Sequence, residues 1–244
     1  MSENNKATLP ASPEEAGGVA AFIFDLGGVL IDLDMTGTQR ACSQLGIAPE
    51  TLFVKSTGKA GGSTVCQGIT TSQMVTGYQV GAVRTEQFLD AMMRCCAPGI
   101  TRQTLIDAWN SCLKTIPQER LDMILRLRQQ GFRTYLLSNT NDLHWQYVLE
   151  HCLSEEGRTA DDLFDGVFLS HEVHLVKPDA AIYRHVIQQI GLPAEQCLFI
   201  DDAKENAEAA CREGICGKWL DLQKEDVCSL VNQCLVHNSL SIKH

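Results

Sequence analysis

The sequence predicts an α/β protein with a parallel sheet, helices on both faces of that sheet, and a small second domain that is mostly helical. Two observations support this prediction. Short apolar runs of strand length alternate with amphipathic helical patterns through the second half of the 244-residue chain. Between residues 36 and 115, polar segments alternate with helical patterns and no strong strand pattern occurs.

The first predicted strand is the run "VAAFIF", residues 19–24, which is apolar at every position. Such a run is typical of a strand that is buried on both faces of its sheet. It leads directly into an acidic residue, Asp25. Residues 1–18 lack the apolar centre of a signal peptide and predict a disordered tail, so the core domain opens with residues 19–35.

The segment 36–115 predicts a helical insert. Within it, "TEQFLDAMMRCC", residues 85–96, carries apolar side chains at helical spacing after a predicted cap at Thr85. The stretch "KSTGKAGGST", residues 55–64, predicts a loop. Its "STGK" is not a phosphate-binding loop, because Phe53 stands where that motif requires glycine and no strand precedes it.

The second half of the chain predicts the rest of the core domain, residues 116–244. The expected strands are residues 134–138, 166–170 and 197–200, with a weaker one at 216–220. The expected helices are residues 118–131, 178–191 (opened by Pro178 and closed by Gly191) and 204–214. This alternation predicts a Rossmann-like parallel sheet, in which ligands bind at the carboxyl ends of the strands.

Polar residues that could act in catalysis or ligand binding follow four of these strands. They are Asp25, then Ser138 and Asn139, then Lys177, and finally Asp201 and Asp202. Each alone is more often an ordinary cap, turn or surface residue. Together at one sheet edge, the carboxylates would repel one another unless a cation such as Mg²⁺ lay among them. A lysine and a serine beside that cation suit a phosphoryl group.

Composition narrows the class of protein. A formal net charge of −10 argues against nucleic acid and against anionic membrane surfaces as partners, but it does not exclude a small phosphorylated metabolite. No apolar run approaches the ~20 residues of a membrane span. The eleven cysteines include no CxxC pair, and we interpret them as reduced thiols of a cytoplasmic protein. The sequence does not predict an oligomeric state.

The order of the site residues, D…S…K…DD, resembles the haloacid dehalogenase (HAD) superfamily of phosphohydrolases. The matching segments are "FIFDLGGVL", "LLSNTN", "HLVKPDAAIY" and "LFIDDAKENAEAA", and the resemblance covers about residues 19–220. Response-regulator receivers use similar residues, but their acidic pair follows the first strand, whereas here it comes last. The 113 residues between Asp25 and Ser138 leave room for a helical cap, residues 36–115, as in one branch of the superfamily.

The resemblance implies a role for each site residue. Asp25 resembles the nucleophile that forms an aspartyl-phosphate, and its carboxylate would bind Mg²⁺ together with the Gly27 carbonyl. Asp202 matches the main metal-binding acid of the fourth motif, with Asp201 beside it. Asn206 stands where that motif often has a further acid or amide.

The same resemblance assigns the phosphoryl group to the neighbouring motifs. Ser138 and the backbone amide of Asn139 would hold its oxygens, and Lys177 would neutralise charge on both the phosphate and Asp25. Gly28 counts among the substrate-binding residues. The predicted activity is therefore Mg²⁺-dependent hydrolysis of a small phosphomonoester, with sugar phosphates among the candidates.

Gly27 departs from the family pattern. Most phosphatases of this family have an aspartate two residues after the nucleophile, and such general acid–base help is typically worth ~10²–10⁴-fold in rate. Three alternatives stay open. The enzyme acts on esters with weakly basic leaving groups, or another acid such as Asp32, Asp34 or a cap residue reaches in; it is a slow regulatory phosphatase; or it is an inactive protein that binds a phosphate ligand. Gly27 could also serve backbone geometry alone.

Two related chemistries are disfavoured. Haloacid dehalogenases share the fold but need no metal, so the acidic pair at residues 201–202 argues against that reaction. A phosphomutase would need the acid–base residue that Gly27 replaces.

Overall fold

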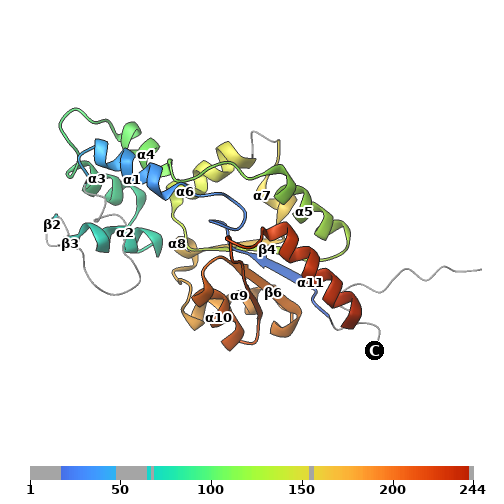
Figure 1. Cartoon of the computed structure of the whole chain (residues 1–244). Coiled ribbons are helices and arrows are strands. Elements are labelled where there is room, and N and C mark those ends of the chain that lie inside the picture. The colour runs from blue at the N-terminus through green and yellow to red at the C-terminus, as the bar shows by residue number, and fades with distance from the viewer. Residues whose placement is uncertain (1–17, 48–64, 67–68, 154–156, 242–244) are drawn as a thin grey trace, which may run out of the picture.

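The computed structural model describes residues 18–47, 65–66, 69–153 and 157–241 (Figure 1). Two predictions, the tail before residue 18 and the loop at residues 55–64 with its "STGK", lie outside the described residues. The centre of the molecule is a five-stranded sheet in the order β5-β4-β1-β6-β7, and each neighbouring pair is parallel. The strands are β1 (Ala21–Phe24), β4 (Arg133–Ser138), β5 (Gly166–Leu169), β6 (Cys197–Asp201) and β7 (Cys216–Trp219).

All five strands correspond to runs that the sequence predicts, and the predicted α/β class is confirmed. β6 is one residue longer than expected, because Asp201 still pairs with Trp219 of β7. The weakest predicted strand is the edge strand β7, which has only one neighbour in the sheet.

Helices cover both faces of the sheet because successive side chains of β1 point to opposite sides. Phe22 and Phe24 share one apolar cluster with the helices of one face, and Ala21 and Ile23 share another cluster with the helices of the other face. The first face carries α5 (Gln118–Gln129), α7 (Ala160–Leu163) and α11 (Val227–Ser241). The second face carries α9 (Ala180–Ile190) and α10 (Lys204–Arg212).

The ends of α9 show how the sequence sets helix boundaries. Gly191 ends the helix in the left-handed region with φ 72°, as predicted. The beginning differs from the prediction, because the cap is Asp179, whose carboxylate accepts the backbone N–H of Ala181, and Pro178 lies before it. The helix α11 and the shorter helices α6 (Asp142–Tyr147), η2 (Val148–Leu153), α8 (Ser170–Val173) and η4 (Ala194–Gln196) were not predicted.

The helices that the structure describes between residues 35 and 110 form a separate body beside the sheet (Figure 1). This helical unit consists of α1 (Met35–Gln44), α2 (Thr71–Gln79), α3 (Thr85–Met93), α4 (Arg102–Asn110) and the hairpin β2 (Val65–Cys66) with β3 (Ile69–Thr70). It has its own core, in which Phe88, Met92 and Leu105 are buried. The two hairpin strands pair with each other and not with the main sheet.

The predicted cap at Thr85 is wrong in detail. Arg84 is the residue before α3, and Thr85 is already helical. The Thr85 hydroxyl instead donates a 2.6 Å hydrogen bond to the carboxylate of Asp142 in α6, which ties the helical unit to the core. A threonine that precedes a helical pattern cannot be distinguished from sequence as a cap or as a tertiary contact.

Two composition-based expectations can be compared with the structure. The ten cysteines whose side chains are described are free thiols, although only four of them are buried. Among the described residues, no helix is both long and apolar enough to cross a membrane.

Candidate active site

The carboxyl ends of three adjacent strands place the predicted site residues at one edge of the sheet. β1 lies between β4 and β6, with Phe24 opposite Leu136 on one side and Ile200 on the other. Asp25 follows β1, while Ser138 and Asp201 are the last residues of their strands. The strand order changes direction at β1, which is the type of position where parallel sheets bind ligands.

Lys177 joins this edge from the loop before α9. Its ammonium donates to Asp25 Oδ1 at 2.8 Å, to Asp201 Oδ2 at 2.6 Å and to the backbone carbonyl of Leu137 at 2.9 Å. The side chain is only 1% exposed. Burial by itself would lower the pKa of Lys177, but the two carboxylates outweigh it, so the pKa is raised and the lysine stays charged.

The two acids after β6 are in different environments. Asp201 is fully buried and both of its oxygens are engaged, because Oδ1 accepts from the backbone of Ala203 at 2.8 Å and the Asn206 amide donates to Oδ1 at 3.0 Å and to Oδ2 at 3.1 Å. Asp202 is half-buried, and its carboxylate lies against Gly28. Asp201 therefore supports Lys177, and Asp202 has more capacity to bind a ligand.

The acidic group fits a divalent cation. One carboxylate oxygen from each of Asp25, Asp201 and Asp202 can be chosen so that all lie within 4.8 Å of one another. That span is close to the ~4.2 Å between opposite ligands of an ion held at ~2.1 Å. Lys177 is the one ammonium bonded to this acidic group among the described residues. With all three carboxylates ionised, the group and Lys177 together would carry two negative charges in excess. Hard oxygen donors with this excess suit Mg²⁺.

The pKa values show the same crowding of charge. Burial raises the pKa of Asp25 to about 6, although Lys177 acts in the opposite direction, and Asp201 raises it further. Burial and the neighbouring Asp201 also raise the pKa of Asp202. Without a cation, this fold therefore favours taking up protons at the site.

Ser138 and Asn139 lie at the same edge, and both line the adjacent pocket. The side chain of Asn139 forms two hydrogen bonds with the backbone of Lys177: Nδ2 donates to its carbonyl at 2.8 Å, and Oδ1 accepts its N–H at 2.9 Å. Asn139 thus fixes the loop that carries Lys177, a contact that the sequence did not reveal. Neither residue caps the following helix, because the cap of α6 is Asn141.

The two glycines after Asp25 differ in backbone conformation. Gly28 has φ +79°, and a Cβ atom there would lie 2.5 Å from Asp202 Oδ2. The alternative that Gly27 provides a positive φ is wrong, since only Gly28 of the two has one. The N–H of Gly28 donates to the Ile31 carbonyl at 2.9 Å, so this glycine brings close approach to Asp202 and offers no amide hydrogen of its own to a ligand.

The acids that the sequence offered as substitutes for an acid at position 27 are engaged elsewhere. Asp32 forms an ion pair with Arg120 at 2.8 Å. Asp34 caps α1 by accepting the Gly37 N–H and pairs with Lys114, and these contacts hold its pKa below the usual value. Neither lines the pocket, and no carboxylate occurs among the lining residues that the structure describes.

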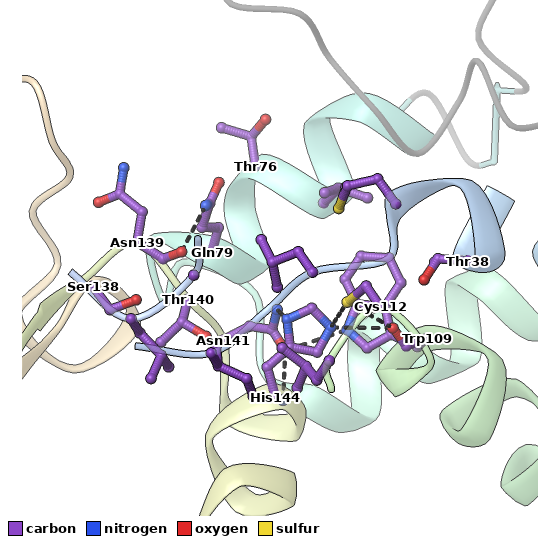
Figure 2. A pocket seen from close by; sticks show the side chains of 17 residues that line it. Thr38, Thr76, Gln79, Trp109, Cys112, Ser138, Asn139, Thr140, Asn141 and His144 are labelled. Carbon is purple, nitrogen blue, oxygen red and sulfur yellow. Dashed lines mark hydrogen bonds between the residues drawn. The ribbon is translucent and has the colours of Figure 1, made fainter. Parts of the chain in front are cut away.

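The pocket lies between this sheet edge and the helical unit, and its volume is about 500 Å³ (Figure 2). Ser138, Asn139 and Thr140 lie at one end, and Trp109, Cys112 and Thr38 lie toward the other (Figure 2). Large apolar side chains form much of its wall: Leu26, Ile31, Leu33, Met35, Val75, Trp109 and Leu113.

A neutral hydrogen-bonded group lies at the far end of the pocket. The Trp109 indole donates to Asn141 Oδ1 at 3.3 Å, and Asn141 Nδ2 lies 3.1 Å from His144 Nδ1. His144 Nε2 lies 3.2 Å from the Trp109 carbonyl, so Nε2 carries the hydrogen and Nδ1 accepts from Asn141. Burial lowers the pKa of His144 to about 4, and the ring is therefore neutral near pH 7.

Gln79 of α2 is a pocket residue that the sequence did not indicate. The side-chain Nε2 of Gln79 donates to the backbone carbonyl of Asn139 at 3.2 Å. The backbone carbonyl of Gln79 accepts from the buried Ser170 hydroxyl at 2.6 Å. The helical unit thus contacts the loop that follows β4 directly (Figure 2). A glutamine in a helical pattern carries no sequence signal for this role.

Comparisons with known proteins agree with this geometry. The family described as haloacid dehalogenase-like hydrolases matches residues 19–212. A D-ribitol-5-phosphate phosphatase of Bacteroides thetaiotaomicron is 26% identical over 76% of this chain and 84% of its own length. A sesquiterpene phosphatase of Aspergillus oryzae is 29% identical over 82% of this chain and 89% of its own length.

A solved structure of a HAD family enzyme from Bacteroides thetaiotaomicron, in complex with magnesium and inorganic phosphate, superposes with a TM-score of 0.73. The two are 28% identical, and the match covers 87% of this chain and 99% of the other. The chain belongs to the haloacid dehalogenase-like hydrolases, as the four sequence motifs predicted.

Proposed function

We propose that this protein is a Mg²⁺-dependent phosphomonoester hydrolase in which Asp25 is the nucleophile. The observation that carries the proposal is the buried ammonium of Lys177, which bridges Asp25 and Asp201 beside Asp202 and Ser138. The names of the two phosphatase relatives support a phosphorylated substrate, and the magnesium complex of the similar solved structure supports the metal.

The chain's own residues suffice to describe the phosphoryl transfer. Lys177 holds Oδ1 of Asp25, so the other oxygen attacks phosphorus while the bond from phosphorus to the alcohol oxygen breaks. The alcohol oxygen leaves as an alkoxide and takes a proton from solvent water, because none of the described residues that line the pocket is an acid. Water then attacks the phosphorus of the aspartyl-phosphate, the bond from phosphorus to the Asp25 oxygen breaks, and inorganic phosphate leaves with the proton of the attacking water. Ser138 donates a hydrogen bond to a phosphoryl oxygen, and Lys177 stabilises the charge on those oxygens.

Asp25, Asp202 and the Gly27 carbonyl would hold Mg²⁺, with Asp201 completing the acidic group. The ion supplies charge neutralisation for the phosphoryl oxygens when it is bound.

The helical unit acts as a cap in this proposal. Residues 36–115 supply the cap, and residues 19–35 and 116–244 supply the core. The support is that residues of α1, α2 and α4 line the pocket opposite the sheet edge, while the unit keeps its own apolar core. A cap over the site would exclude water and set specificity.

A second candidate function is a weakly active or inactive protein that binds a phosphate ligand. Two observations favour it. Position 27 is a glycine, and none of the described residues that line the pocket is a carboxylate. Such a protein would keep the charged site and lose general acid catalysis.

The test is turnover of p-nitrophenyl phosphate, whose leaving group needs no acid. We expect activity with Mg²⁺, loss of activity in EDTA, and a loss on the order of 10⁴-fold or more in the Asp25→Asn variant. A cooperative thermal unfolding transition at a temperature no lower than that of the wild type serves as the control for folding. Activity that survives chelation, or that survives in Asp25→Asn, contradicts the proposal. Phosphate binding without any turnover supports the second candidate.

A further inference from the structure

We infer that the substrate of this site is the phosphate ester of an apolar alcohol, such as a medium-length alkyl or isoprenoid-type alcohol, and not of a polyol. This inference rests on the proposed function, because it concerns the part of the ester that the phosphoryl site does not hold. Three features of the pocket support it: the apolar wall, the hydrogen bonds that its polar side chains already form, and the absence of ionised side chains among its described lining residues.

The wall exposes apolar surface where a ligand would lie. Five large hydrophobic side chains are exposed in the described part of the protein, and two of them, Leu33 and Met35, line this pocket at 42% and 41% exposure. Both precede or open α1, at the junction of core and cap. Exposed apolar side chains that gather at a concave site favour an apolar ligand.

Most of the polar side chains that line the pocket already have a hydrogen-bond partner in the protein. Trp109, Asn141 and His144 form a closed hydrogen-bonded group, as described above. The amide nitrogen of Gln79 is bonded to the Asn139 carbonyl, and the Thr38 hydroxyl lies 3.1 Å from that of Ser111. A polyol would lose its hydrogen bonds to water on entry and, apart from the hydroxyls of Thr76, Ser138 and Thr140, would find most polar side chains of the described wall already bonded.

The charge of the site lies at one end only. Among the described lining residues, none carries an ionised side chain, because His144 is neutral and the charged group of Asp25, Lys177, Asp201 and Asp202 lies beyond Ser138. The cavity of about 500 Å³ therefore has Ser138 and Asn139 at one end and a mainly apolar, uncharged wall toward the other (Figure 2). That volume is in the range of ordinary small-molecule sites.

A chain-length series tests the inference. Ethyl, butyl, hexyl and octyl phosphates release primary alcohols of the same basicity, so differences in kcat/KM report binding of the chain and not the leaving group. We expect kcat/KM to rise by about fourfold for each added methylene until the pocket is filled. Ribitol 5-phosphate, also an ester of a primary alcohol, should be a poorer substrate than hexyl phosphate.

Two further measurements separate this inference from the proposed function. Turnover of p-nitrophenyl phosphate with a flat chain-length series, or with ribitol 5-phosphate preferred, overturns the inference and leaves the proposed function intact. Alkylphosphonates of the same lengths, which are not hydrolysed, are titrated calorimetrically in the presence of Mg²⁺. If nothing is turned over, affinity that rises with chain length still supports an apolar site, and affinity independent of length overturns it.

A matched pair of variants locates the effect. Leu33→Asn replaces an exposed side chain of the pocket, and Leu222→Asn replaces one that is 53% exposed and does not line it. We expect Leu33→Asn to lower the ratio of octyl to ethyl phosphate kcat/KM by roughly three- to tenfold. Leu222→Asn should leave that ratio unchanged. Equal ratios in wild type and Leu33→Asn would contradict the inference that the alkyl chain of the substrate lies against this wall.

Discussion

The two ends of the pocket differ in the charge of their buried polar groups. At the sheet edge, Asp25, Lys177 and Asp201 are buried and charged, and they are bonded directly to one another. At the far end, His144 is buried and neutral, and it is held by an amide and a backbone carbonyl. Lys177 keeps its charge on burial because two carboxylates contact it, whereas no carboxylate among the described residues is bonded to His144, and burial leaves that ring neutral.

This difference explains how one cavity can hold a molecule with two unlike halves. In the proposed function, the charged end would bind a phosphoryl group and a cation, and the neutral end would offer an uncharged surface to the alcohol. If the neutral end carried charges, it would compete for the phosphoryl group or for the metal.

Removing the ammonium should have the largest effect. Lys177→Met leaves Asp25 and Asp201 buried without a counter-ion, and breaking a buried ion pair in this way costs about 3–5 kcal/mol of unfolding free energy. Urea unfolding at pH 8 in EDTA measures this loss. We also expect turnover of p-nitrophenyl phosphate to fall by about 10²–10³-fold.

Lys204→Met is the matched control, because Lys204 is 63% exposed and its pair with Glu208 spans 3.7 Å. Its unfolding free energy should change by no more than about 0.5 kcal/mol. Similar losses in the two variants would mean that the buried position of Lys177 contributes nothing.

The two ends should respond to pH in opposite directions in the metal-free protein. The folded state raises the pKa of Asp25 to about 6, so its contribution to stability is full below about pH 4 and is lost as the pH rises through 6. The pKa of His144 is lowered to about 4, so its contribution is full above about pH 6.5 and is lost as the pH falls through 4. Each shift corresponds to about 3 kcal/mol.

Single variants separate these contributions. Between pH 4 and 6.5 in EDTA, stability should rise with pH more steeply in Asp25→Asn than in wild type, and less steeply in His144→Gln. The measurement is urea unfolding at several pH values in that window. Parallel curves for the three proteins would show that neither group has a shifted pKa.

The two glycines beside Asp25 should differ in tolerance. In Gly28→Ala, the new Cβ adds strain at φ +79° and meets the Asp202 carboxylate at 2.5 Å. Because Asp202 must then move, we expect a roughly 10–100-fold loss of Mg²⁺ affinity or activity. Gly27→Ala places its Cβ 3.0 Å from the end of the flexible Leu33 side chain and should lose little. Magnesium titrations of turnover compare the two, and equal losses would contradict this account.

The smallest expected effect is a gain. Gly27→Asp introduces a carboxylate into the pocket at a position with ordinary φ, where only Leu33 must shift. We expect turnover of alkyl phosphates to rise by roughly tenfold, below the ~10²–10⁴-fold of a well-placed acid, because no neighbour orients the new side chain. Turnover of p-nitrophenyl phosphate should not rise. A gain on both substrates would point to a cause other than leaving-group protonation.

The charged end was largely predictable from the sequence. Asp25 follows a strand that apolar patterning reveals, Ser138 and Asp201 end two others, and parallel pairing brings these strand ends to one edge. Lys177 was found by its place in the motif order, and the structure brings it to both acids. The assignment of catalytic and metal-binding roles to these residues stays a prediction until it is tested.

The neutral end could not be predicted. Trp109, Asn141 and Gln79 come from two helices of the cap and from the loop that begins α6, and no spacing in the sequence relates them. The exchange of hydrogen bonds between Asn139 and Lys177 joins residues 38 positions apart in the same unpredictable way.

The strands, three of the helices that cover them (α5, α9 and α10) and the order of the charged residues could be predicted from the sequence alone, because these depend on local periodicity and on the rules of parallel sheets. Only the tertiary structure decided which acid is saturated, which glycine needs its positive φ and that the pocket wall is apolar. Those properties depend on contacts between atoms of distant segments. The same contacts bury a group and thereby change its charge.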